Sequence, residues 1–197
     1  MSRDETLPDV SSTLLRLLND ALTPGTVTLA PPKGATSRLT LFLYKVLESP
    51  YLKNEDRRVT QRPNGQLVEE PPPMFVDLYY LLTAHALTVQ PDEPVKAQRA
   101  LSRAMRVLYD NAILAGSAIQ STSDRGLTSG DTLRITLNPI SMEDMTRIWS
   151  VFPDTQYELS VTYLVTPVPI QSARELGSAP VIDQIHDTGL QIPVGRG

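Results

Sequence analysis

Cysteine is absent from the 197-residue chain, and no apolar run approaches the ~20 residues that a membrane span needs. Without a thiol the chain forms no disulfide, no thiolate metal site and no cysteine nucleophile, which fits a reducing compartment. The opening "MSRDETLPDV" lacks the apolar core of a signal peptide. The net charge of −4 argues against binding nucleic acid through bulk charge. We therefore expect neither a membrane nor nucleic acid among the partners.

Motifs of common enzymes and cofactor sites are also missing: GxxxxGK, GxGxxG, HExxH and GxSxG do not occur. The chain has only two histidines. His85 follows a predicted strand that contains Asp77, but on an extended strand the two lie about 26 Å apart, too far for a hydrogen bond. We therefore expect no catalytic, cofactor-binding or metal-ligating residue and no cofactor. His85 is expected to cap the strand end through a backbone bond or to lie at an interface.

Proline, in contrast, is abundant, with 17 residues. The clusters at 31–32, 71–73, 91–94 and 167–169 predict edges between elements, because proline lacks a backbone donor. The length suits one domain, which can bury roughly 70% of its unfolded surface.

Two segments have the apolar period of amphipathic helices. Residues 9–22 are expected to be capped by Asp9 or Ser11 and to end at "TPG". Residues 91–110 have Pro94 in the first turn, where the missing donor costs nothing. The side chains of this second helix that are predicted to face the core are Ala97, Leu101, Ala104, Met105 and Leu108.

A shorter helix is predicted in "SMEDMTRIWSVF", with Ser141 as the N-cap and Asp144 at the reciprocal position. The side chains expected to point inward are Met142, Met145, Trp149 and Phe152.

Strands are predicted at 26–30, 38–48, 74–84, 132–140 and 157–170. Segments 38–48 and 74–84 are apolar on both faces, so both should be inner strands covered on two sides. Segment 157–170 alternates between apolar and polar residues, and we expect the face with Ser160, Thr162 and Thr166 to be partly exposed to solvent.

Two long polar excursions interrupt these elements. Residues 49–73 contain a flap, 51–70, which we interpret as a two-stranded hairpin turning tightly at Asn64-Gly65. Residues 111–131 are rich in Ser, Thr and Gly and are expected to be mobile or ordered by a partner. The order of elements predicts an α+β fold with a single mixed, largely antiparallel sheet and flanking helices. We expect one domain over 1–170 and a C-terminal extension over 171–197.

Three blocks in one order carry a family resemblance: "LTLFLYKVLESPYLKNEDRR", "PPPMFVDLYYLLTAHA" and "LRITLNPISMEDMTRIWSVFPDTQYELSVTYLVTPVPI". They resemble the cap, or tube-terminator, proteins of extracellular contractile injection systems, phage-tail-like particles related to the type VI secretion system. The resemblance covers residues 7–170 and includes Leu52, Asn54 and Glu55.

The resemblance implies a phage tail-terminator-like fold and a structural, non-enzymatic role. Copies of such proteins form a homohexameric ring at the end of the particle distal to the baseplate. The ring stops inner-tube growth and engages the last sheath layer, so the implied partners are further copies, the inner-tube protein and the sheath protein. The implied location is the bacterial cytoplasm during assembly and then the particle, which is released extracellularly in such systems.

Several residue groups are candidates for contacts with tube, sheath or a neighbouring copy. In the flap they are Leu52, Asn54, Glu55, Arg57 and Arg58, whose arginines offer fork-shaped donors. On helix 91–110 a basic stripe of Lys96, Arg99, Arg103 and Arg106 is either a solvated face or a contact for an acidic protein. In the extension, Val181, Ile182 and Ile185 are candidate anchors on a neighbour's sheet edge.

Two alternatives remain at this stage. One is a small hydrolase or ligand-binding domain with a pocket beneath flap 51–70. The other is an adaptor that binds nucleic acid through the basic stripe, which would be marked by steep salt dependence.

Overall fold

A computed structural model describes residues 5–50, 52, 58–61, 67–70, 72–120, 127–128 and 130–172. The helices are α1 (Thr6–Ala21), α2 (Glu93–Asp110) and α3 (Met142–Trp149), with a 3₁₀ turn, η1 (Gly116–Ala118). The strands are β1 (Val27–Leu29), β2 (Leu39–Glu48), β3 (Arg58–Gln61), β4 (Leu67–Glu70), β5 (Met74–Ala84), β6 (Ile113–Ala115), β7 (Thr132–Leu137) and β8 (Ser160–Ile170).

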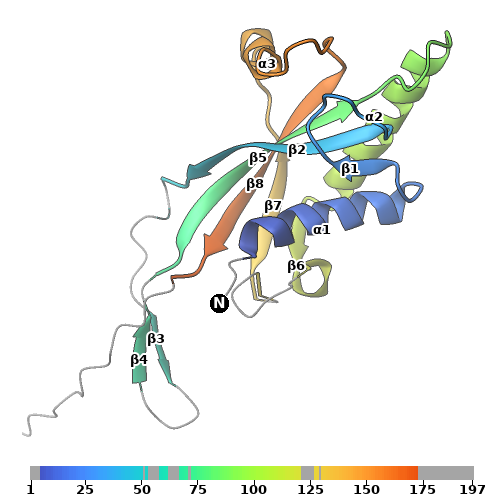
Figure 1. Cartoon of the computed structure of the whole chain (residues 1–197). Coiled ribbons are helices and arrows are strands. Elements are labelled where there is room, and N and C mark those ends of the chain that lie inside the picture. Colours follow the sequence, from blue (N-terminus) through green and yellow to red (C-terminus); the bar gives the residue numbers. More distant parts are fainter. Residues whose placement is uncertain are drawn as a thin grey trace, which may run out of the picture.

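A six-stranded sheet in the order β1-β2-β5-β8-β7-β6 forms the centre of the molecule (Figure 1). Only β1 and β2 are parallel; the other neighbours are antiparallel. Helices α1 and α2 lie on one face and α3 on the other (Figure 1). The predicted α+β fold with one mixed, largely antiparallel sheet and flanking helices is confirmed.

The two faces of β5 explain why helices lie on both sides. Leu78, Tyr80 and Leu82 point to the larger core cluster with α1 and α2, whereas Leu81 points to a second cluster with Met145 and Trp149 of α3. Successive strand residues face opposite ways, so one strand that is apolar at every position needs cover on both faces. The prediction for 74–84 is confirmed for Tyr80–Ala84, whereas Asp77 and Tyr79 are half-buried and Met74 is exposed.

Strand β2 is covered over only half of its length, which corrects the prediction of two covered faces. Leu39 and Leu41 are buried, but Val46 and Leu47 are 42% and 44% exposed. The core clusters include β2 residues only as far as Tyr44. The far end of β2, with Met74 of β5 beside it, is therefore an uncovered end of the sheet.

Helix α1 begins at Thr6, three residues before the predicted start, and the predicted caps are wrong. Asp9 lies in its first turn, fully buried, and accepts a hydrogen bond from the backbone N–H of Leu127 at 3.3 Å. Ser11 shares a 2.8 Å hydrogen bond with the hydroxyl of Tyr80. Burial raises the pKa of Tyr80 to about 12, so this hydroxyl stays neutral.

Helix α2 follows the prediction closely. Pro94 lies in its first turn, and Ala97, Leu101, Ala104 and Leu108 are buried. Met105 is half-buried.

Helix α3 is capped as predicted: the Ser141 hydroxyl accepts a 3.0 Å hydrogen bond from the N–H of Asp144. Met145 and Trp149 are buried, and Phe152 is half-buried. Met142 is 68% exposed, contrary to the prediction, because the core cluster under α3 does not extend to its first residue.

Replacing Ser141 by alanine is expected to lower the free energy of unfolding by about 1 kcal/mol, because one N–H of the first turn loses its acceptor. Ser102→Ala, at an exposed position within α2, is the matched control and should change stability by less than about 0.5 kcal/mol. Urea denaturation measures both. Equal effects of the two substitutions would show that the cap does not stabilise α3.

Strand β8 is an inner strand, and its predicted wet face is wrong. Ser160 and Thr162 are 7% and 2% exposed because they lie opposite Thr83 and Leu81 of β5, on the face of the sheet that α3 covers. Their hydroxyls are satisfied within the sheet: Ser160 bonds the Thr83 hydroxyl at 2.9 Å, and Thr162 donates to the carbonyl of Asn138.

The proline cluster at 167–169 does not mark an element edge, because it lies inside β8. Thr166 is the last β8 residue that pairs with β7. Pro167 and Pro169 follow it, where β8 has a partner strand on one side only. Proline tolerates such an edge because no neighbour needs its missing N–H.

The excursion 111–131 is partly ordered on the domain itself, contrary to the expectation. It begins with strand β6, which pairs with β7 at the sheet edge. Ile119 and Leu127 are buried in the main core, and Arg16 of α1 donates to the carbonyl of Ala118 at 2.7 Å. Residues 121–126 and 129 lie outside the described residues.

The predicted hairpin in the flap is confirmed: β3 and β4 form a separate antiparallel pair from Arg58–Glu70 to Gln61–Leu67. The turn at Asn64-Gly65 lies outside the described residues. Strands β2 and β5, which the flap connects, pair antiparallel as expected.

Candidate interaction surfaces

His85 joins the ends of three strands. Its backbone N–H donates to the carbonyl of Arg38 at 2.9 Å, just before β2, which confirms the expected backbone bond. Its Nε2 lies 2.8 Å from the hydroxyl of Thr40 in β2, and its Nδ1 contacts the carboxylate of Glu158, just before β8. The ring is 3% exposed. The arrangement fixes β2 and β8 to the end of β5.

Glu158, and not Asp77, is the acidic partner of His85, and sequence reasoning missed it. Asp77 instead accepts a hydrogen bond from Thr166. The β5–β8 register pairs Thr83 with Ser160, and its continuation brings residue 85 opposite residue 158. Only the knowledge that these strands pair antiparallel in this register would have shown the contact, because the two residues are 73 positions apart.

A hydroxyl, an imidazole and a carboxylate in this order are the groups of a hydrolase triad, so access decides what they can do. The side chain of Thr40 is fully buried, and no substrate carbonyl reaches its oxygen. The three side chains can therefore stabilise strand ends, but in this arrangement Thr40 cannot act as a nucleophile.

A second buried polar contact lies beside the first. Arg38 donates to Glu93 at 2.6 Å and to the carbonyl of His85 at 3.0 Å, and Glu93 also accepts from the N–H of Leu87. Lys96 lies 3.2 Å from the Glu93 carboxylate. Hydrogen bonds, first from Arg38 and then from Lys96 and the Leu87 backbone, lower the pKa of Glu93 from 4.5 to about 2.

This shift predicts a loss of stability in acid. A carboxyl whose folded pKa is lowered stabilises the fold fully above its unfolded value of 4.5, and the contribution disappears as pH falls through about 2. We expect the unfolding free energy of the wild type to fall more steeply between pH 4.5 and 2 than that of Glu93→Gln, which has no charge to lose. Urea titrations across this range measure the difference; parallel curves would contradict it.

The basic stripe on α2 separates into two parts. Lys96 is paired with Asp92 at 2.8 Å and with Glu93. Arg99, Arg103 and Arg106 are exposed, and within the described part of the chain no acidic side chain pairs with them. The predicted basic surface is therefore reduced by one charge, because Lys96 forms ion pairs within the chain itself.

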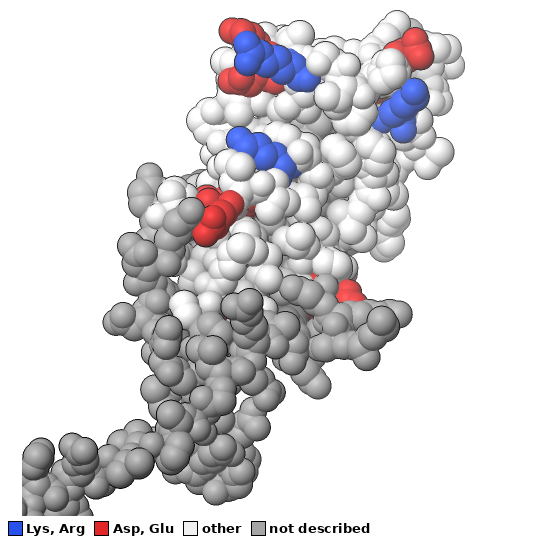
Figure 2. Space-filling model, turned by 60° about the vertical axis from the view of Figure 1, so that its left-hand side comes forward, with Lys and Arg blue, Asp and Glu red and all other residues white. Residues whose placement is uncertain are grey.

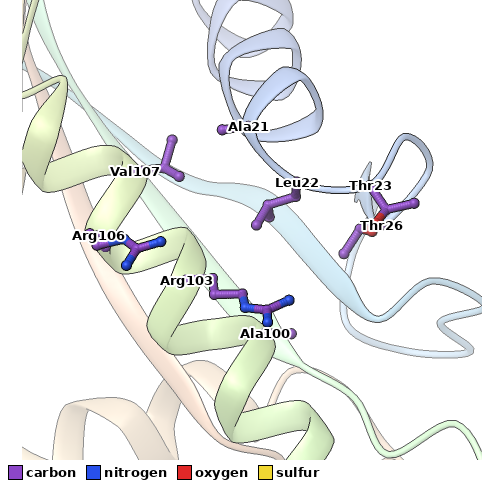
Figure 3. A pocket seen from close by; sticks show the side chains of 8 residues that line it. All are labelled: Ala21, Leu22, Thr23, Thr26, Ala100, Arg103, Arg106 and Val107. Carbon is purple, nitrogen blue, oxygen red and sulfur yellow. The ribbon is translucent and has the colours of Figure 1, made fainter.

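Arg103 and Arg106 border an open recess of about 410 Å³ between α2 and the end of α1 (Figure 3). We call it the arginine recess. Its lining residues are Ala21, Leu22, Thr23, Thr26, Ala100, Arg103, Arg106 and Val107. In Figure 3 both arginines extend from α2 toward the α1 side. The recess offers guanidinium donors, threonine hydroxyls and apolar contacts, a combination that suits a carboxylate next to an apolar side chain.

The remaining predicted contact residues are only partly described. Leu52 is half-buried, and Arg58 is the first residue of β3. Asn54, Glu55, Arg57, Val181, Ile182 and Ile185 lie outside the described residues, so their roles stay predictions, as do the boundary at residue 170 and the pocket beneath the flap.

Charge is scattered over the described surface. On the face shown in Figure 2, single charged side chains and small groups of both signs are separated by wide uncharged areas. Among the described residues, no group of three or more acidic or histidine side chains is placed to hold a metal ion, and none of the described helices is long and apolar enough to span a membrane.

Fold and surfaces together define a small α+β domain built on one sheet, with separate exposed surfaces on its two faces. The chain belongs to the family described as the Pvc16 N-terminal domain, whose model matches residues 9–184. No curated protein matches the chain.

Two solved structures have a similar fold. One is the sheath/tube terminator of the PVC extracellular contractile injection system in its extended state, with a TM-score of 0.65 and 21% identity over 99% of this chain. The other is the tube-terminating cap of the anti-feeding prophage, with a TM-score of 0.63 and 21% identity over 90% of this chain. The matches span 65% and 59% of the lengths of those two chains.

Proposed function

We propose that the chain is a structural cap that ends the inner tube of a contractile injection system and engages the last layer of its sheath. The observation that carries the proposal is the family match over residues 9–184, together with the fold shared with a sheath/tube terminator and a tube-terminating cap. Partners in this role are further copies of the chain in a homohexameric ring, the inner-tube protein and the sheath protein.

The mechanism is steric. A ring of copies presents one surface to the finished tube and offers no surface to which another tube subunit can add. The buried Thr40 hydroxyl supports a role without bond making or breaking. The ring is assembled with the particle in the bacterial cytoplasm and remains part of the particle when it acts outside the cell.

The surfaces for tube and sheath lie on the parts of the chain that the domain leaves exposed. The uncovered end of the sheet carries Val46, Leu47 and Met74, which are 42–48% exposed. Flap 51–70 connects β2 and β5 at this end, so the two together form one candidate surface. The parts of loop 115–131 that are not buried in the core, as Ile119 and Leu127 are, and the extension 171–197 supply further contacts, and Val181, Ile182 and Ile185 add to the edge of a neighbouring sheet.

Electron microscopy and mass measurement of the purified chain test the assembly part of the proposal. Rings of about six copies are expected, because repeated head-to-tail contacts close into a ring when the rotation allows it. A monomer that turns over a small ester or amide would contradict the proposal and support the hydrolase alternative.

Removing residues 171–197 tests the extension separately. The truncated chain is expected to keep its cooperative thermal unfolding, since the sheet ends at Ile170, but to lose assembly into rings or onto sheath. Ring and sheath assembly at the wild-type level would show that the extension plays no part in either contact.

A further inference from the structure

The arginine recess and the α3 segment, defined as residues 142–157, lie on opposite faces of the sheet. Helices α1 and α2 pack on the face to which Tyr80 points, and α3 packs on the face to which Leu81 points. Figure 1 shows α3 and the chain that follows it standing away from the sheet, on the side opposite α1. A contact between these two surfaces therefore joins different patches of two molecules.

Among the described residues, none pairs with the charges of the recess. Arg103 and Arg106 are both exposed and, among the described residues, have no ion pair, whereas Lys96 on the same stripe has two. None of the described residues that line the recess is acidic. Two guanidinium groups three positions apart on a helix lie on one face, so both can reach a single incoming carboxylate.

The α3 segment has the opposite charge. It contains three acidic residues and one arginine. Glu143 is paired with Arg147 at 2.6 Å, and Asp144 accepts from the Ser141 hydroxyl. Asp154 is exposed, at a φ of 62°, in a turn closed by a bond from the N–H of Thr155 to the carbonyl of Phe152. No ion pair within the described part of the chain uses its carboxylate.

Apolar side chains accompany this carboxylate. Val151, three residues before Asp154, is 67% exposed, Met142 is 68% exposed and Tyr157 is 49% exposed. Exposed apolar groups gathered on one projecting segment are typical of an interaction surface. The recess supplies matching apolar contacts from Leu22 and Val107 beside its arginines.

We propose that the α3 segment of one copy docks in the arginine recess of the next, with Asp154 accepting hydrogen bonds from Arg103 and Arg106 and Val151 contacting the apolar lining. Because the two surfaces differ, each added copy leaves one of each kind free, and copies add until the ring closes. An interface of one patch with itself would stop at a dimer. This inference rests on the proposed ring and names the contact that builds it.

Disulfide trapping tests the contact directly, because the chain contains no cysteine of its own. Thr23→Cys in one chain and Val151→Cys in another are mixed and mildly oxidised; both positions are exposed. Cross-linked dimers are expected in clear excess over the control mixture of Thr23→Cys with Leu137→Cys, which is exposed on β7. Equal yields in the two mixtures would overturn the contact.

Variants that change the charged residues of the two surfaces test whether the recess of one copy binds the α3 segment of another. The recess variant is Arg103→Glu with Arg106→Glu, and the α3 variant is Val151→Gln with Asp154→Asn, which adds no positive charge that could attract the new glutamates; asparagine tolerates the positive φ. Each alone is expected to raise the concentration for half-assembly on the order of a hundredfold. Mixed together they should form 1:1 dimers and nothing larger, because only one intact surface of each kind remains.

Lys33→Glu with Arg134→Glu makes the same charge change at exposed positions outside the recess and the basic stripe and should leave assembly unchanged. All variants should unfold at the wild-type temperature, which separates lost docking from lost folding. If the recess variant forms rings as readily as the wild type, the proposed contact is wrong, while the cap proposal still stands. Wild-type chains that do not assemble, together with cysteine variants that do not cross-link, would also overturn the contact, while the cap proposal itself is judged by the length of tubes.

Discussion

Replacing Leu78 by alanine is expected to lower the free energy of unfolding by about 3–5 kcal/mol. Leu78 lies on central strand β5, is 0% exposed and belongs to the core that α1 and α2 cover. Its truncation removes apolar contacts and leaves a cavity in the layer between the sheet and these helices, where the surrounding elements collapse only partly.

For a chain of this length the loss corresponds to a fall of about 10 °C in the unfolding temperature. Differential scanning calorimetry measures it. Val89→Ala is the control, because Val89 is fully exposed and its truncation should change stability by less than about 0.5 kcal/mol. A fall of less than about 1 °C for Leu78→Ala would contradict the placement of β5 at the centre of the core.

Replacing His85 by alanine is expected to cost about 3 kcal/mol of stability. The substitution leaves the buried Thr40 hydroxyl without its 2.8 Å partner and Glu158 without the imidazole, and it opens a cavity at the end of β5. The strand ends of β2, β5 and β8 then lose the side chain that joins them.

Glu158→Gln is the informative comparison, because an amide oxygen still accepts a hydrogen bond from the imidazole. Its expected cost is about 1 kcal/mol, well below that of His85→Ala. Chemical denaturation measures both, and an ester-hydrolysis assay on the wild type runs beside it. The structural role of His85 would be contradicted if the His85→Ala protein were as stable as the wild type. It would also be contradicted if the wild type hydrolysed the ester and this substitution abolished the activity.

Much of the fold could be predicted from local patterns. Strand β5 is apolar at nearly every position, and that pattern alone placed it inside the sheet with cover on both faces. Pro94 and Ser141 marked two helix starts because a missing donor and a hydroxyl cap have local causes. The hairpin of β3 and β4 was predicted because the connection between strands β2 and β5, residues 49–73, is too long for a structureless loop.

The errors arose where distant parts of the chain meet. Ser160 and Thr162 look like a wet face until α3 is placed over that face of the sheet. Val46 looks buried, but the core clusters on β2 extend only to Tyr44. Asp9 has the residue type of a helix cap, but it is buried and accepts a hydrogen bond from the backbone of Leu127, 118 positions away. No local pattern contains these contacts.

The site was less predictable than the fold for the same reason. The basic stripe on α2 was visible in the sequence, and the pairing of Lys96 has a local cause, since Asp92 and Glu93 lie four and three positions before it. The recess beside Arg103 and Arg106 depends on how α1 packs. The His85–Glu158 contact depends on the β5–β8 register. Residues Asn54, Glu55, Arg57, Val181, Ile182 and Ile185 stay predictions from the sequence.

The central claim is that this chain ends a tube, and tube length measures it most directly. Particles are assembled with and without the chain, and the lengths of their tubes are compared by electron microscopy. We predict a narrow length distribution with the chain, and tubes without it that are long and variable, with the narrow distribution restored when the chain is supplied again. Tubes of the same uniform length in its absence would contradict the account.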